Sequence, residues 1–171
     1  MKQAMINYMK NPKNDEVFTP SYAVKPILQY IPSHWVCWEP TDFGSSEITK
    51  ELRMNGNTVI TSHIDDDQNF FDYEPDEHYD IIITNPPYSL KTEFLERAYK
   101  LDKKFAFLLP ITSLEGKARG KVYREYDELE LLVFDGRVEF YKGKNSIYFN
   151  TSWFCRNVLP KQLVFYELKK G

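Results

Sequence analysis

The sequence is poor in cysteine, in histidine and in long apolar runs, and each shortage excludes a class of protein. Two cysteines and three histidines show no zinc-ligand spacing, so we expect no metal site. Cys37 and Cys155 lie in apolar runs, which favours buried, reduced thiols over a disulfide. No apolar run approaches the roughly 20 residues that span a bilayer. The opening stretch, MKQAMINYMK, lacks the apolar segment of a secretion signal, so we expect a cytoplasmic protein that does not contact membranes.

Charge of one sign is not in large excess either, because 22 basic and 25 acidic residues give a net charge of −3. The distribution is uneven. Residues 61–80 carry eight acidic side chains and no Lys or Arg, whereas residues 91–124 carry nine basic and four acidic side chains. The basic segments can give phosphate a positive face, or they can be ordinary solvated helix faces, and charge alone leaves both readings open.

What the sequence does contain is an alternation of apolar runs and helical periodicity between residues 35 and 134. Helices are predicted at 19–31, 44–54, 90–101 and 112–126. Strands are predicted at 35–38, 57–64, 79–84, 105–109 and 129–134, and further β runs at 137–142, 150–156 and 162–168. This order predicts an α/β, Rossmann-like fold: a mostly parallel sheet, helices on both faces and antiparallel C-terminal strands.

Individual residues predict several boundaries. Thr19 is expected to cap the first helix, with Pro20 at its first position and Pro32 after its end. Ser89 is expected to cap the helix over 90–101, and Asn55-Gly56 to end the helix over 44–54. Residues 1–14, rich in Asn and Lys, are expected to form a flexible basic arm before a single domain over residues 15–171.

The segment TNPPY, residues 84–88, follows the most apolar strand and precedes a helix. Ligands of open α/β sheets bind at the carboxyl ends of the strands, so this loop lies where chemistry is expected. Pro86 and Pro87 fix φ and remove two donors, which leaves a stiff loop with unpaired carbonyl oxygens. Asn85 adds an amide oxygen and Tyr88 an aromatic face. The combination suits a planar group that bears an NH₂, although an ordinary Asn-Pro turn is the alternative.

This motif resembles the Asn-Pro-Pro-Tyr motif of S-adenosylmethionine-dependent amino-methyltransferases, above all the adenine-N6 DNA methyltransferases, and the chain resembles small phage-type members. The resemblance implies a methyltransferase fold, S-adenosylmethionine as cofactor and an exocyclic amine as acceptor. It implies that Asn85 and the Pro86 carbonyl orient the amine, in a loop that Pro87 stiffens. Tyr88 would stack on a base flipped out of a duplex.

Three further stretches resemble cofactor motifs of that family. The tripeptide 18–20 is similar to the motif that touches the methionine end, and the dipeptide 39–40 resembles the start of the glycine-rich loop. The pair 69–70 stands where an Asp-Phe pair contacts the adenine ring of the cofactor. Together with neighbouring residues, the resemblance implies cofactor contacts at these positions: Phe18, Thr19, Pro20, Glu39, Pro40, Gly44, His63, Asp65, Asn69 and Phe70.

The chain also departs from the family. Gly44 is the only glycine of the loop after residue 40, where the family has a Gly-x-Gly turn. His63 stands where an acidic residue takes both ribose hydroxyls, and a neutral imidazole accepts only one hydrogen bond. Asp65 is a nearby substitute, and a purely structural His63 is equally open. Either cofactor binding is variant, or the fold has lost catalysis and binds nucleic acid or a protein partner.

No separate target-recognition domain is expected, because the core elements use nearly all residues after 88. We expect nucleic acid as partner, with DNA favoured over RNA, and methylation of RNA or of protein glutamine remains an alternative. Low sequence specificity, or a single-stranded or RNA substrate, is therefore expected. The segment 142–150 is a candidate for contacts with nucleic acid, and an ordinary β turn is the alternative. The candidate phosphate contacts outside the arm are Lys117, Arg119, Lys121, Arg124, Lys142 and Lys144.

Overall fold

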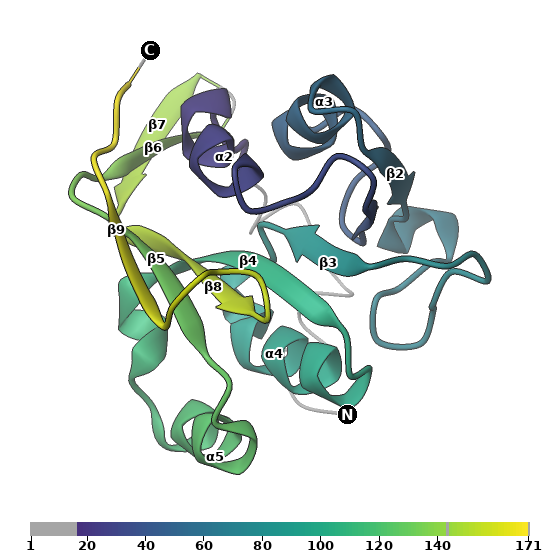
Figure 1. Ribbon diagram of the computed structural model, residues 1–171. Coiled ribbons are helices and arrows are strands. Elements are labelled where there is room, and N and C mark those ends of the chain that lie inside the picture. The colour runs from purple at the N-terminus through teal and green to yellow at the C-terminus, as the bar shows by residue number, and fades with distance from the viewer. Residues whose placement is uncertain (1–16, 143, 171) are drawn as a thin grey trace.

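The computed structural model describes residues 17–142 and 144–170, so the predicted arm over residues 1–14 lies outside the described residues. Within these described residues, a seven-stranded sheet and a two-stranded hairpin are combined with four α-helices and three short 3₁₀ helices (Figure 1). The strands are β1 (Val36–Glu39), β2 (Thr58–Thr61), β3 (Ile81–Thr84), β4 (Lys104–Pro110), β5 (Glu130–Phe134), β6 (Val138–Lys142), β7 (Asn145–Phe149), β8 (Thr151–Arg156) and β9 (Leu163–Tyr166). The helices are α2 (Ser21–Leu28), α3 (Glu47–Met54), α4 (Lys91–Lys100) and α5 (Lys117–Tyr126), with 3₁₀ turns η2 (Ile64–Asp66), η3 (Tyr88–Leu90) and η4 (Ile111–Leu114).

The strand order of the large sheet is β2-β1-β3-β4-β8-β5-β9. Strands β1 to β4 pair in parallel, β8 lies antiparallel between β4 and β5, and β9 is parallel to β5. This confirms the predicted α/β architecture with antiparallel pairing near the C-terminus. The chain leaves β1 for β2 on one side and then crosses to β3 on the other, so the order reverses between β1 and β3. Such a reversal opens a crevice at the carboxyl ends of the strands.

Helices cover both faces of the sheet, and successive strand residues alternate between two apolar clusters, as the period of a strand requires. Cys37, Ile81 and Ile83 pack with α2 and α3, whereas Trp38 and Ile82 pack with α4 and α5. Because both faces are covered, the central strands are apolar throughout.

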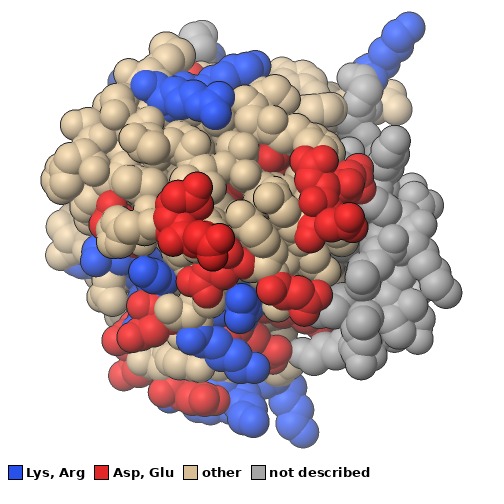
Figure 2. Space-filling model, turned by 90° about the vertical axis from the view of Figure 1, so that its right-hand side faces the viewer, with Lys and Arg blue, Asp and Glu red and all other residues tan. Residues whose placement is uncertain are grey.

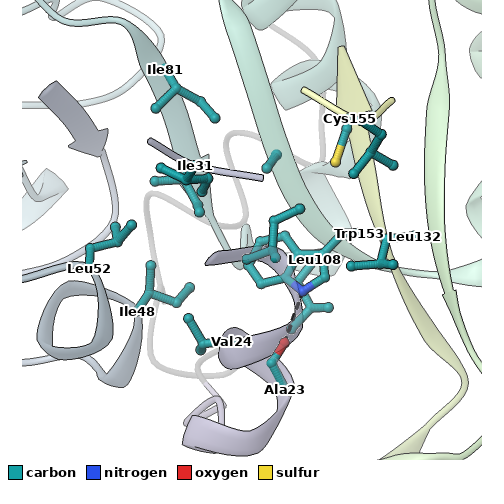
Figure 3. Packing of buried hydrophobic residues seen from close by; sticks show 14 of the residues in the cluster. Ala23, Val24, Ile31, Ile48, Leu52, Ile81, Leu108, Leu132, Trp153 and Cys155 are labelled. Carbon is teal, nitrogen blue, oxygen red and sulfur yellow. Dashed lines mark hydrogen bonds between the residues drawn. The ribbon is translucent and has the colours of Figure 1, made fainter. Parts of the chain in front are cut away.

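Figure 3 shows part of the first cluster, in which Trp153 of β8 donates from Nε1 to the carbonyl of Ala23 in α2 at 2.9 Å. That bond ties the helix at the start of the described chain to the middle of the sheet. Cys37 and Cys155 are buried free thiols, as predicted. Among the described residues, no helix has the length and apolar character that crossing a membrane requires.

Several predicted boundaries are wrong by a few residues. Helix α2 has Pro20 at its N-cap with no side-chain cap, and it ends at Leu28, so Thr19 does not cap it and Pro32 does not end it. Helix α4 has Leu90 at its cap position instead of Ser89, because η3 intervenes after the two prolines. Gly116, at φ +107°, separates η4 from α5 and so divides the helix expected over 112–126.

Other boundaries follow the prediction more closely. Helix α3 ends before Gly56, which has φ +95° and supplies the predicted left-handed residue. Strand β2 is shorter than the run 57–64, since its last residues turn into η2. One residue separates β7 from β8, but β6 and β7 pair with each other in a two-stranded sheet that is separate from the large sheet.

Candidate functional site

A cavity of about 770 Å³ opens at the carboxyl ends of β1, β2 and β3, at the reversal of strand order. Its size is typical of small-molecule and cofactor sites. Each of the three strands contributes residues at or just after its end, and α2 and α3 contribute the residues around their N-termini. The lining residues are Val17, Phe18, Thr19, Pro20, Ser21, Glu39, Thr41, Asp42, Phe43, Ser45, Ser46, Glu47, Ile48, Lys50, His63, Asn85, Pro86, Pro87 and Tyr141.

Asn85 follows the last residue of β3 and is half-buried in this lining. Its Nδ2 donates to Oγ1 of Thr19 at 3.0 Å, which fixes the orientation of the amide. Its Oδ1 is buried and has no hydrogen-bond partner among the described residues. A buried acceptor without a partner costs about 1–3 kcal/mol, so the oxygen is held ready for a donor that the chain does not supply.

The rest of the TNPPY loop divides between the cavity and the hairpin. Pro86 and Pro87 are buried and line the cavity. Tyr88 begins η3 and is not among the lining residues; its ring lies edge-on to Phe140, with centroids 6.3 Å apart, and to Phe149, at 5.4 Å. The structure therefore brings three of the four predicted catalytic residues to the cavity and places the fourth against β6 and β7.

Glu39, the last residue of β1, carries a buried carboxyl group. Its Oε1 accepts from the backbone N of Thr41 at 3.0 Å and from Oγ1 of Thr41 at 2.9 Å. The Thr41 hydroxyl also lies 2.7 Å from that of Thr84, the residue before Asn85. Burial raises the pKa of Glu39 to about 8, against hydrogen bonds that lower it, so the carboxyl is largely protonated at neutral pH.

The loop between β1 and α3 is held by Asp42, which the sequence analysis did not single out. Its carboxylate accepts from the backbone N–H groups of Ser45 and Ser46 and from Oγ1 of Thr49 at 2.6 Å. Burial alone raises the pKa of Asp42, but these hydrogen bonds outweigh it and hold the pKa below its ordinary value. The spacing of an acid three and four residues before two serines is the signal that identifies this loop. Gly44 takes φ +98° within it.

At the end of β2, His63 is only 4% exposed and lines the cavity. Its Nδ1 accepts from the backbone N of Asp65 at 3.1 Å, so a neutral ring carries its proton on Nε2. The ring of Phe43 packs against it, tilted by 33°, with a centroid distance of 3.8 Å. Asp65 itself is exposed and does not line the cavity. This end of the cavity thus carries an imidazole ring where the resembled family has a carboxylate.

Only part of the predicted cofactor set meets at the cavity. Phe70 is buried in the second apolar cluster, where its ring stacks on Phe94 at 4.5 Å. Asn69 accepts at Oδ1 from the backbone N of Phe71 at 3.2 Å and is not a lining residue. The predicted cofactor residues in the lining are Phe18, Thr19, Pro20, Glu39 and His63; those outside it are Pro40, Gly44, Asp65, Asn69 and Phe70.

The predicted phosphate contacts also differ from one another. Arg119 donates to the carbonyl of Ser113 at 2.8 Å, to Oγ1 of Thr92 at 3.1 Å and to the carbonyl of Glu115, so its guanidinium joins η4 and α5 to the start of α4. The exposed candidates are Lys117, Lys121 and Arg124 on α5 and Lys144 on the hairpin. The side chain of Lys142 is not among those that the structure describes.

Acidic side chains occupy a different side of the molecule. Seven of the eight acids in residues 61–80 are exposed. Figure 2 shows acidic groups across the middle of the side on which β2 lies, with Lys and Arg mainly toward its top and lower edge. Acidic groups in such numbers make this part of the surface unfavourable for phosphate groups.

The sequence matches no protein-family model, and no curated protein is significantly similar to it. Solved structures do share the fold. A protein of Pyrococcus horikoshii assigned as an RNA methyltransferase superposes with a TM-score of 0.62 at 13% identity, over 87% of this chain and 90% of that one.

Two structures from type I restriction-modification enzymes are also similar. One, from a study of how such a system assembles, has a TM-score of 0.54 at 14% identity, over 97% of this chain and 48% of that one. The other, from Vibrio vulnificus YJ016 and assigned as a modification subunit, has a TM-score of 0.53 at 10% identity, over 99% of this chain and 51% of that one. The chain spans about half the length of these two. At such identities the likeness defines the fold: the chain has the Rossmann-like fold of methyltransferases.

Proposed function

We propose that the protein transfers the methyl group of S-adenosylmethionine to an exocyclic amine, and that the acceptor is N6 of adenine in DNA. The observation that carries the proposal is the buried, unpartnered Oδ1 of Asn85, fixed by Thr19 at the edge of a large cavity. The methyltransferase fold supports it, because the cavity lies at the strand ends where ligands of such sheets bind.

The residues present fit the cofactor at its methionine end. Thr19, Pro20 and the loop over residues 41–46 surround that part of the cavity, and Glu39 lies beneath the same loop. The cofactor supplies an electrophilic methyl group on a sulfonium. His63 lines the cavity after the end of β2, at the position that the family resemblance assigns to the ribose of the cofactor.

The chain's own contribution to the reaction is orientation. Oδ1 of Asn85 and the carbonyl oxygen of Pro86 accept from the two N–H bonds of the acceptor, which turns the nitrogen lone pair toward the methyl group. Pro86 and Pro87 keep the loop rigid, so the acceptor meets a preformed site. A direct in-line transfer would break the C–S bond of the sulfonium as the N–C bond forms, and it would release S-adenosylhomocysteine and one proton of the amine, so no nucleophilic side chain is required.

The part of the cavity near His63, where the nucleoside of the cofactor would lie, supports a second function. The carboxylates in the lining belong to Glu39, Asp42 and Glu47, so none comes from the residues that follow β2, and Asn69 and Phe70 lie outside the lining. A methyltransferase fold that binds nucleic acid or a protein partner without catalysis would account for the missing cofactor contacts. Calorimetric titration with S-adenosylmethionine separates the two functions: the enzyme binds it, and the non-catalytic module shows no heat at high micromolar ligand.

The proposed reaction is tested with radiolabelled S-adenosylmethionine and equal amounts of DNA, RNA and protein as acceptors. We expect label in DNA and its loss in Asn85→Ala, while Asn69→Ala, the same change outside the cavity, keeps it. Label confined to RNA or protein corrects the acceptor. Transfer that survives Asn85→Ala contradicts the role of this residue.

A further inference from the structure

Three of the aromatic side chains that line the cavity are exposed to solvent: Phe18 is 66% exposed, Phe43 57% and Tyr141 45%. Large exposed apolar side chains gathered around a cavity are typical of a binding surface. Phe43 already packs against His63. Phe18 and Tyr141 make no contact with another aromatic ring among the described residues, so their faces remain available.

Phe18 and Tyr141 lie directly opposite each other although they are far apart in the sequence. The N–H of Phe18 donates to the carbonyl of Tyr141 at 2.7 Å, and the N–H of Tyr141 donates to that of Phe18 at 3.1 Å. Residues paired in this way project their side chains to the same face of the two strands. The next residue, Thr19, holds the amide of Asn85. The two rings are therefore connected, through the backbone of Thr19, to Asn85, the side chain that we propose orients the amine.

The surroundings of the pair favour a nucleic-acid strand over a protein chain. Lys144, three residues after Tyr141 at the tip of the β6–β7 hairpin, is exposed, and the exposed Lys50 lines the same cavity as the ring pair. The segment over residues 61–80, which carries eight acidic side chains, follows β2 on the opposite side of the molecule from this hairpin (Figure 1). Exposed rings next to cations are the usual platform for unpaired bases, whereas a glutamine side chain has no aromatic face to stack.

We propose that Phe18 and Tyr141 form the stacking wall for the methyl acceptor, which is an unpaired nucleobase. The inference rests on the proposed function, and it assigns Phe18 to the acceptor, although the motif around it suggested a cofactor contact. Tyr88 is packed edge-on against Phe140 and Phe149 and is not among the residues that line the cavity. A base held between the ring pair and Asn85 must have left its duplex, because a paired base cannot enter a cavity.

The test uses the full chain and a single-stranded oligodeoxynucleotide that contains 2-aminopurine, whose fluorescence is quenched by stacking. Phe18→Ala and Tyr141→Ala are each expected to weaken oligonucleotide binding about tenfold and to reduce the quenching. Phe18→Tyr and Tyr141→Phe keep an aromatic ring and are expected to bind like the parent. Tyr148→Ala is the matched control, because Tyr148 is 50% exposed on the same hairpin but does not line the cavity.

Titration of every variant with S-adenosylmethionine separates this inference from the proposed function. We expect its affinity to be unchanged in all of them. The inference is overturned if the alanine variants bind the oligonucleotide like the parent, if Tyr148→Ala weakens binding as much, or if Phe18→Ala weakens cofactor binding instead. A parent that binds the cofactor but no oligonucleotide also overturns it and leaves the cofactor site standing. A parent that binds the oligonucleotide but no cofactor contradicts only the proposed reaction.

Discussion

Asn85 combines one satisfied and one unsatisfied group in a single side chain. Its Nδ2 is bound to Thr19 while its buried Oδ1 has no partner among the described residues. Selection for stability alone removes such a group, so its presence is consistent with a ligand that supplies the missing donor. The residue could be predicted from the sequence because the TNPPY motif is local. Its bond to Thr19 could not, because the two residues meet only after the sheet and α2 have formed.

Replacing Asn85 with Ala is expected to change the free energy of unfolding by no more than about 1 kcal/mol. The lost hydrogen bond to Thr19 is offset by removal of the unsatisfied oxygen. Methyl transfer is expected to fall by roughly a hundredfold or more, as when one preorganised polar group is removed from an active site. Denaturant unfolding and the transfer assay measure the two effects. A large loss of stability together with activity would mean that Asn85 is a structural residue.

Glu39 predicts a pH dependence of stability. Burial raises its pKa in the folded protein to about 8, from an ordinary 4.5. The folded state therefore retains a proton that the unfolded state loses, and stability falls as pH rises from about 4.5 to about 8. In Glu39→Gln this contribution is absent, so its unfolding free energy is expected to fall less over that range. Denaturant unfolding of both proteins at several pH values compares the slopes, and parallel curves would contradict the assignment.

At the scale of elements, Arg119 shows how a basic residue can belong to packing instead of to a ligand. Its guanidinium joins Ser113, Thr92 and Glu115, which lie on or beside η4, α4 and α5. The sequence placed it with its basic neighbours, because spacing along a helix does not reveal which side chain folds back. Asp42 was missed for a related reason: the family pattern drew attention to glycines, while this chain holds the same loop with a carboxylate.

Arg119→Gln is expected to lower the free energy of unfolding by about 1–3 kcal/mol, since it leaves carbonyls without their donor. Lys121→Gln, on the exposed side of the same helix, is expected to change it by less than about 0.5 kcal/mol. Thermal or denaturant unfolding of the two variants provides the comparison. Equal effects would show that the bonds of Arg119 do not stabilise the packing of α5.

At the scale of the whole molecule, the mostly parallel sheet, the burial of both sheet faces and the position of the TNPPY loop were predictable from periodicity and from the order of elements. The identity of the residues that line the cavity was less predictable. Phe18 and Tyr141 pair across most of the chain, which no local pattern indicates. Long-range pairing thus decides which residues of a motif reach the site.

Charge distribution gives a prediction at the same scale. If the exposed cations of α5 contact phosphates, oligonucleotide binding weakens with salt, and each neutralised residue lowers the slope of log affinity against log salt by about 1. Lys117, Lys121 and Arg124 are the residues to replace with Gln, singly and together, with titrations at several salt concentrations. Unchanged slopes would place the phosphate contacts elsewhere, for example on the hairpin.

The central claim is that the cavity beside Asn85 binds S-adenosylmethionine, and thermal unfolding with and without this ligand tests it most directly. A ligand that binds only the folded state must stabilise it, by about 2.7 kcal/mol at a hundred times its Kd. We predict a rise in melting temperature that grows with ligand concentration and is matched by heat in calorimetric titration. An unchanged melting temperature at high micromolar ligand, with no heat of binding, would contradict the account.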